Sequence, residues 1–107
     1  MRGPTLLLAL FVAGCAPCEF DSAIVRGEVL GQDGEPLPAG LVQLIPTSGE
    51  TTELTLFGEG FYEGSVAAGD YEVVAYDEAQ TCFSEIHEVT VEPCDELVVD
   101  LTIVGCF

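Results

Sequence analysis

The feature that most constrains the fold is the regular spacing of turn-forming residues after residue 15. Short runs of β-branched and aromatic residues are separated by glycine, proline or aspartate at intervals of about ten residues. No segment there repeats its apolar residues at helical spacing. This pattern is typical of an all-β sandwich. We therefore predict seven strands, at residues 23–30, 40–45, 52–57, 61–66, 71–77, 83–91 and 97–104.

The alternation also predicts which side chains point inward. In the fifth strand, Tyr71, Val73 and Ala75 share one face, opposite Val74 and Tyr76. In the seventh, Leu97, Val99, Leu101 and Ile103 are expected to face the core.

Two strands depart from simple alternation. The strand at 52–57 alternates threonines with Leu54 and with the pair Leu56-Phe57. In the strand at 83–91, Ile86 is out of phase with the other apolar residues, which indicates a β-bulge.

The first 14 residues have the composition of an export signal. Arg2 precedes the apolar stretch 6–12, and the small residues Ala13 and Gly14 stand directly before Cys15. The apolar stretch is shorter than the roughly 20 residues that span a bilayer.

Val12-Ala13-Gly14-Cys15 resembles the lipobox of bacterial lipoproteins. The resemblance implies cleavage before Cys15 and a covalent lipid on its thiol. We therefore expect a signal peptide at 1–14, a lipidated tether at 15–22 and one domain at 23–107. Ala16, where some lipoproteins carry an inner-membrane retention aspartate, favours the outer membrane by the same resemblance.

Four further cysteines can pair with one another, since disulfides persist in exported proteins. They allow three pairings, and their spacing alone does not choose among them. Zinc is a weaker alternative, because Cys82, Cys94 and Cys106 are 12 positions apart and lack the close spacing of structural zinc sites.

Several short motifs together resemble the carboxypeptidase regulatory-like domain, a transthyretin-like sandwich. They are Gly27-Glu28-Val29, Asp33-Gly34-Glu35-Pro36-Leu37, Val42-Gln43-Leu44, Gly60-Phe61 and Ala68-Gly69-Asp70-Tyr71-Glu72-Val73. The resemblance covers roughly residues 24–103. It implies a seven-stranded, Greek-key-like transthyretin-type sandwich, and it specifies fold better than function.

This fold implies a disulfide pairing. If successive strands alternate in direction, Cys18 and Cys94 lie at one end of the sandwich, and Cys82 and Cys106 lie at the other. The first and last strands are neighbours in transthyretin-like sandwiches, which brings the first pair within reach. The resemblance therefore predicts Cys18–Cys94 and Cys82–Cys106.

The charge of the chain is strongly one-sided. All 19 Asp and Glu residues follow Cys15, against Arg26 alone, so residues 15–107 carry a net charge of −18. Such a surface repels nucleic acid and anionic lipid head groups. The simplest interpretation is a solvated surface, and a cation or a basic partner is the alternative.

The supply of catalytic residues is poor. The chain has one histidine, His87, and no serine in a nucleophile-elbow context. Because His87 is in phase with Val89 and Val91, we interpret it as a core or edge residue. The C-terminus lacks the Tyr-Arg-Gly-Ser motif of transthyretin-like hydroxyisourate hydrolases. We therefore expect no enzymatic activity.

Calcium is the one cofactor with some support in the sequence. Candidate oxygen ligands lie in three places, Asp33 with Glu35, Glu59 with Glu63, and Asp77 with Glu78. None of them has the dense ligand spacing of an EF-hand. We expect a non-catalytic, lipid-anchored binding or structural module of the cell envelope, with an unknown envelope protein or glycan as partner. A calcium- or carbohydrate-binding surface domain is the alternative.

The charge predicts a salt dependence. Moderate NaCl screens repulsion among the acidic side chains, so it should raise the melting temperature. Thermal unfolding followed by circular dichroism at increasing NaCl checks this. A melting temperature that falls would contradict it.

Overall fold

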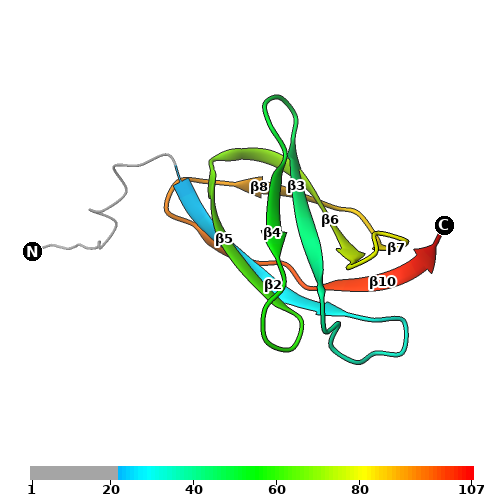
Figure 1. Ribbon diagram of the computed structural model, residues 1–107. Helices are drawn as coiled ribbons and strands as arrows, with labels where there is room; N and C mark the ends of the chain where they lie inside the picture. Colours follow the sequence, from blue (N-terminus) through cyan, green and yellow to red (C-terminus); the bar gives the residue numbers. More distant parts are fainter. Residues whose placement is uncertain (1–21) are drawn as a thin grey trace, which may run out of the picture.

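The computed structural model describes residues 22–107, whereas the predicted signal segment, Cys15 and Cys18 lie outside the described residues. Residues 22–107 contain no helix, and so none that is long and apolar enough to cross a membrane. They form nine strands (Figure 1): β2 (Ser22–Leu30), β3 (Gly40–Pro46), β4 (Thr52–Thr55), β5 (Phe61–Ala67), β6 (Gly69–Asp77), β7 (Cys82–Ser84), β8 (His87–Val91), β9 (Glu96–Val98) and β10 (Leu101–Cys106).

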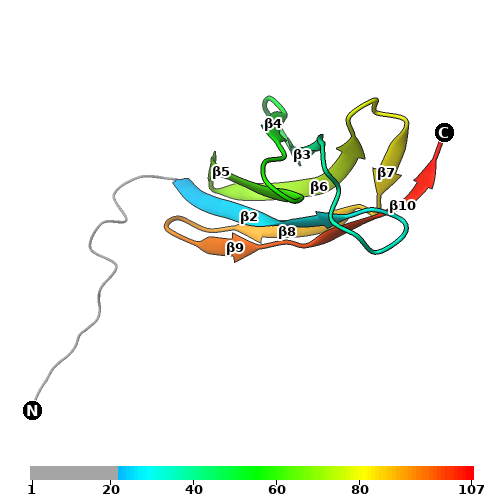
Figure 2. The same ribbon diagram turned by 60° about the horizontal axis from the view of Figure 1, so that its bottom comes forward.

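The strands form two layers that meet along one side. In one layer β4, β3 and β6 pair in that order, and β7 and β8 follow one another along the other edge of β6. In the other layer β5 pairs with β2, and β9 and β10 follow one another along the opposite edge of β2 (Figure 2). Antiparallel pairing of β10 with β7 joins the two layers.

The open sides of the two layers also approach each other. A Cβ atom at Gly64 of β5 would lie only 2.4 Å from Cδ2 of Leu54 in β4. Leu54 therefore packs directly on the backbone of β5, where a larger residue would collide. The result is an all-β fold, as the alternation predicts. Its sheet is nearly closed into a barrel and is consistent with the predicted sandwich.

The core lies between the layers and consists mainly of β-branched and aliphatic side chains. Its largest fully buried members are Tyr62, Leu44, Leu101, Val25, Val29, Val42, Val73 and Val91. Tyr71, Val73 and Ala75 are buried as predicted, but Val74 is also buried, only 4 % exposed, although the alternation places it on the outward face. The outward face of β6 is therefore partly covered as well.

The predicted strand at 83–91 is two strands, β7 and β8, instead of one. The break follows Ser84, whose buried hydroxyl accepts a hydrogen bond from the Ala75 amide (2.8 Å) and donates one to the Glu85 carbonyl (2.7 Å). A side-chain oxygen thus replaces a backbone acceptor of the ladder. Ile86, expected at a bulge, lies in the break and is 61 % exposed.

The predicted strand at 97–104 is also interrupted, between β9 and β10. There the Asp100 carboxylate accepts a hydrogen bond from the Glu28 amide (3.0 Å), and the Val99 carbonyl accepts one from the Tyr62 hydroxyl. A Cβ at Gly27 would lie 2.0 Å from that carbonyl oxygen, so the close approach requires glycine. The count of nine strands in the described chain, instead of seven, results from these two breaks.

One predicted disulfide is confirmed. Cys82 and Cys106 lie opposite each other in the β7–β10 pair and are joined. The first and last strands are neighbours, as the resemblance implies, because β2 pairs with both β9 and β10 in parallel. The other predicted bridge involves Cys18 and stays a prediction, because Cys18 lies outside the described residues.

The buried Tyr62 hydroxyl gives a test of this packing. Tyr62→Phe removes the donor and leaves the Val99 carbonyl without it, which should cost about 1–3 kcal/mol in the free energy of unfolding. Urea denaturation measures the change. Tyr76→Phe is the matched control, since the Tyr76 hydroxyl makes no hydrogen bond within residues 22–107. Equal stability of the two variants would contradict the assigned role.

Candidate functional site

An apolar groove lies on the outer face of β5, β2 and β9, and we call it the Phe groove. It encloses about 470 Å³. Its apolar walls come from Phe57, Phe61 and Val98, which are 55, 48 and 57 % exposed. Its polar lining comes from Arg26, Glu28, Glu63 and Asp100.

A tight hairpin holds the two phenylalanines side by side. The Phe57 amide donates to the Phe61 carbonyl (2.8 Å), and the Phe61 amide donates to the Phe57 carbonyl (3.1 Å). The turn between them needs positive φ angles, 58° at Gly58 and 84° at Gly60, which glycine adopts readily. The backbone positions of this exposed pair are therefore fixed by hydrogen bonds.

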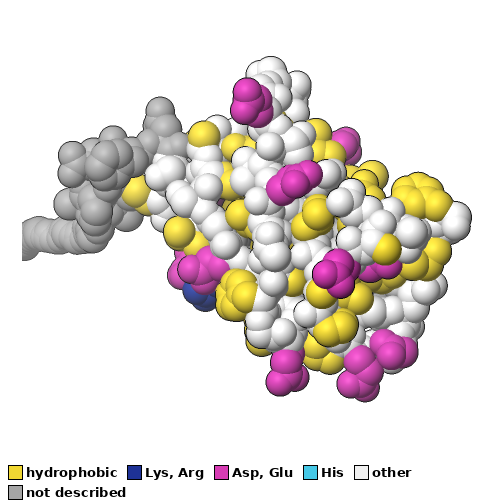
Figure 3. Space-filling view, in the orientation of Figure 1, with side chains coloured by type: hydrophobic (Ala, Val, Ile, Leu, Met, Phe, Trp, Pro, Cys, Tyr) yellow, Lys and Arg dark blue, Asp and Glu magenta, His cyan; other side chains and the backbone are white. Residues whose placement is uncertain are grey.

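Strand register places the charged residues of the Phe groove. Phe61 lies opposite Glu28, and Glu63 lies opposite Arg26, whose other neighbour is Val98 on β9. Apolar and charged side chains therefore alternate across the three strands. Figure 3 shows magenta and yellow side chains gathered beside the single dark-blue patch at lower left.

Arg26 already forms an ion pair with a residue on the same face. Its Nη1 atom lies 2.6 Å from Oε2 of Glu96. Both side chains are about half exposed, so the ion pair adds little to stability. Glu28 and Glu63 form no ion pair within residues 22–107. The Phe groove therefore presents two carboxylates that no described cation neutralises.

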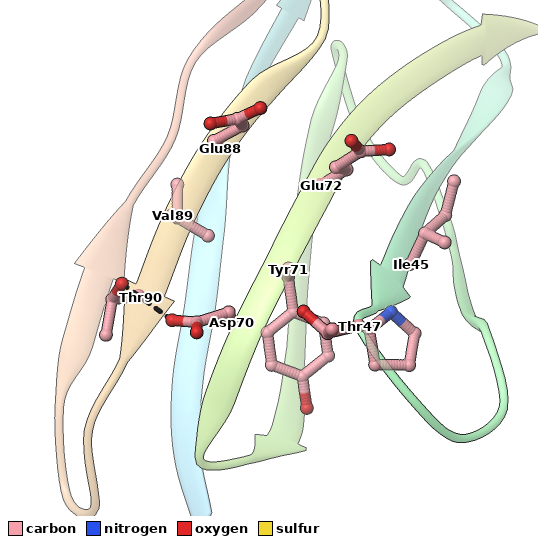
Figure 4. Close-up of a pocket in the computed structure, with 9 residues that line it drawn as sticks. Ile45, Thr47, Asp70, Tyr71, Glu72, Glu88, Val89 and Thr90 are labelled. Atoms are coloured by element: carbon pink, nitrogen blue, oxygen red, sulfur yellow. Dashed lines mark hydrogen bonds between the residues drawn. The ribbon is translucent and has the colours of Figure 1, made fainter.

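A second groove lies over β3, β6 and β8 and encloses about 680 Å³ (Figure 4). Ile45, Glu72 and Glu88 stand in one row across the three strands. In the next row, the Thr90 hydroxyl donates to the Asp70 carboxylate (2.8 Å). This groove is acidic, since Asp70, Glu72 and Glu88 line it.

The predicted calcium ligands serve as turn residues. Asp33 Oδ1 accepts a hydrogen bond from the Glu35 amide (3.0 Å) within its loop. The Asp77 carboxylate accepts from the amides of Thr81 (2.8 Å) and Cys82 (3.0 Å) and from the Thr81 hydroxyl (3.0 Å). Within residues 22–107, no three His, Cys, Asp or Glu side chains converge on a metal position. Calcium binding at the candidate residues stays a prediction.

His87 begins β8 at the side of the sheet, and its side chain is 38 % exposed. It is therefore an edge residue, the second of the two sequence interpretations. Its Nε2 atom lies 3.4 Å from Oε2 of Glu85. In the part of the chain that the structure describes, no hydrogen bond joins His87 to a serine or threonine.

Sequence reasoning missed the Phe groove. It placed Phe57 in a strand with Leu56, but β4 ends at Thr55 and Phe57 lies in the hairpin. The available signal was the symmetry of Phe57-Gly58-Glu59-Gly60-Phe61, in which two identical apolar residues flank a glycine turn. The contribution of Val98 depends on pairing across β2, which the local sequence does not reveal.

No family model matches the sequence, and no curated protein matches it. Two solved structures share its fold with a TM-score of 0.60 each, DUF3823 family proteins from Bacteroides ovatus and Parabacteroides merdae. They are 20 and 17 % identical, and the alignments cover 78 and 81 % of this chain. This chain spans slightly under half of their length, 45 and 48 %.

A third solved structure is the dioxygenase domain of a dioxygenase carbohydrate-binding protein fusion from Streptomyces sp. SirexAA-E. It has a TM-score of 0.51 and 11 % identity, and the alignment covers 86 % of this chain and 84 % of that one. At these identities the likeness establishes a common fold alone. The carboxypeptidase regulatory-like assignment stays a prediction.

The Asp77 turn predicts a pH dependence. Hydrogen bonds from the Cys82 amide, and then from Thr81, hold the pKa of the Asp77 carboxyl below its usual value. The ionised Asp77 carboxylate therefore stabilises the folded state fully at pH values above the unfolded-state pKa, near 4. This stabilisation is lost as pH falls through the lower folded-state pKa.

Melting curves of wild type and Asp77→Asn measure this effect. The difference in melting temperature should be constant above about pH 5 and should shrink below about pH 4. Glu78→Gln is the control, because this exposed neighbour makes no hydrogen bond within residues 22–107. A difference between wild type and Asp77→Asn that grows on acidification would contradict the assignment.

Proposed function

We propose that the protein is a non-catalytic, lipid-anchored module of the bacterial cell envelope that binds a partner through the Phe groove. The observation that carries the proposal is the groove itself. Its aromatic pair and Val98 expose apolar surface beside the carboxylates of a strongly acidic domain. Clustered exposed apolar surface of this kind is typical of interaction sites.

The direction of β2 supports the combination of anchor and groove. Ser22 begins β2 opposite Ala67, and Phe61 lies opposite Glu28, six residues farther along the strand. At about 3.3 Å per residue, the hairpin is roughly 20 Å from the point where the tether enters the sandwich. A domain anchored through its N-terminus would thus carry the Phe57–Phe61 hairpin at the end distant from the anchor.

The proposed anchor is a lipid on Cys15, in the lipobox-like sequence. Two or three acyl chains hold a protein at a membrane far more firmly than one chain does. The absence of aspartate at position 16 favours the outer membrane, with the domain in an extracytoplasmic space.

A second disulfide, Cys18–Cys94, would fasten the tether to the sandwich. In support, the Cys94 amide donates a hydrogen bond to the Ser22 carbonyl (2.8 Å), so Cys94 lies beside the residue that begins β2. Only three residues separate Cys18 from Ser22. On the chain-entropy estimate, such a bridge stabilises the fold by about 4–5 kcal/mol.

A non-catalytic role is supported by the surroundings of the single histidine. His87 neighbours Glu85, and neither residue lines the Phe groove. The groove offers carboxylates and aromatic rings, which are suited to recognition.

Mass spectrometry of the protein purified from its native membrane tests the proposal. We expect a mature N-terminus at Cys15 with added acyl mass, and a Cys18–Cys94 peptide pair that separates on reduction. The Cys82–Cys106 pair is the internal control for oxidation. An unmodified Cys15 would overturn the anchor, and Cys94 in its reduced form would overturn the second bridge.

A further inference from the structure

The chemistry of the Phe groove specifies its partner more closely. We propose that the groove binds a cationic segment of another protein, with one apolar side chain between Phe61 and Val98 and with Lys or Arg side chains at Glu28 and Glu63. This inference rests on the proposed binding function and deepens it.

The width of the groove suits a single side chain. Phe61 on β5 and Val98 on β9 are separated by one strand, β2, and by two residues along it, so their backbones lie roughly 12 Å apart. Gly27 faces inward, toward Val99 and Tyr62, so the outward β2 side chains beside Phe61 and Val98 are Glu28 and Arg26. An apolar side chain that enters this space contacts Phe61 and Val98 and removes their surface from water.

The carboxylates specify the charge of the partner. Glu28 and Glu63 flank the Phe61 side of the groove as diagonal neighbours on paired strands, about 7–8 Å apart. The one arginine of the face is engaged by Glu96, so it does not neutralise them. Asp100 and the Glu59 of the hairpin add further negative charge nearby. A partner with cations beside its apolar residue matches this field.

The same charges disfavour two other occupants. A second copy of the chain would bring two strongly acidic surfaces together, with one arginine on each. An anionic lipid surface would meet the same repulsion. A cationic protein segment is attracted by the same charges that repel a second copy of the chain and an anionic lipid surface.

Nuclear magnetic resonance with peptide probes tests the proposal on the labelled protein as it is purified from its cells. The probe is the capped pentapeptide Lys-Gly-Phe-Gly-Lys, in which an extended backbone places the ring and both amines on one side. We expect saturable shifts of the Phe61, Glu63 and Val98 amides. The control peptides are Glu-Gly-Phe-Gly-Glu, which reverses the charge, and Lys-Gly-Ser-Gly-Lys, which removes the ring.

Two pairs of variants separate the contributions. Phe61→Ser should weaken binding about tenfold, whereas Ile86→Ser, at a residue of similar exposure outside the groove, should not change it. Glu63→Gln should weaken binding and its salt dependence, whereas Glu88→Gln, with the same change of net charge on the other layer, should leave both unchanged.

Several outcomes would overturn the inference. They are equal shifts with the Lys-Gly-Ser-Gly-Lys peptide, shifts that map to the groove over β3, β6 and β8, and concentration-dependent broadening of Phe57 and Phe61 without peptide, which would indicate self-association. Shifts of Phe61 and Val98 with vesicles of phosphatidylglycerol in place of the peptide would assign the groove to lipid.

The failure of this inference can be told apart from the failure of the proposed function. If the Glu-Gly-Phe-Gly-Glu peptide binds in the groove instead, the groove remains a binding site and only the partner's charge is wrong. If no probe shifts Phe61 or Val98, the binding function of the groove fails as well.

Discussion

The structure depends on the position of β10, which pairs with two strands that belong to different layers. Its residues Leu101 and Thr102 pair in parallel with the end of β2, and its last residues pair antiparallel with β7. The Cys82–Cys106 disulfide closes this second pair covalently. Since the ladders between the other named strands of residues 22–107 stay within a layer, β10 is the strand that makes one sandwich of two sheets.

Side-chain oxygens make the interruptions on either side of β10 possible. Ser84 and Asp100 each accept a hydrogen bond from a backbone amide of a neighbouring strand, and Glu85 Oε1 accepts one from the Thr102 amide (3.2 Å). Each bond supplies an acceptor where the regular ladder stops, which avoids an unsatisfied amide. Each strand can therefore be interrupted without leaving these backbone amides unsatisfied.

The local sequence pattern predicts which side chains of a regular strand face the core. Alternation placed Tyr71, Val73 and Leu101 in the core, because a half-buried strand requires that period. It could not predict that Ser84 or Asp100 would interrupt a strand, since a polar residue in a strand is normally assigned to the outward face. The Phe groove was also out of reach, because Phe61 and Val98 meet only across β2. Pairing of distant strands decided these features.

Hydrogen exchange followed by nuclear magnetic resonance tests the central role of β10 most directly. If β10 joins the layers, its amides should exchange only through global unfolding, at the same rate as the protected amides of β2 and β6. Ile103, buried between the layers, is the most informative position. Exchange of β10 as fast as the loop at residues 47–51, with β2 and β6 still protected, would contradict this account.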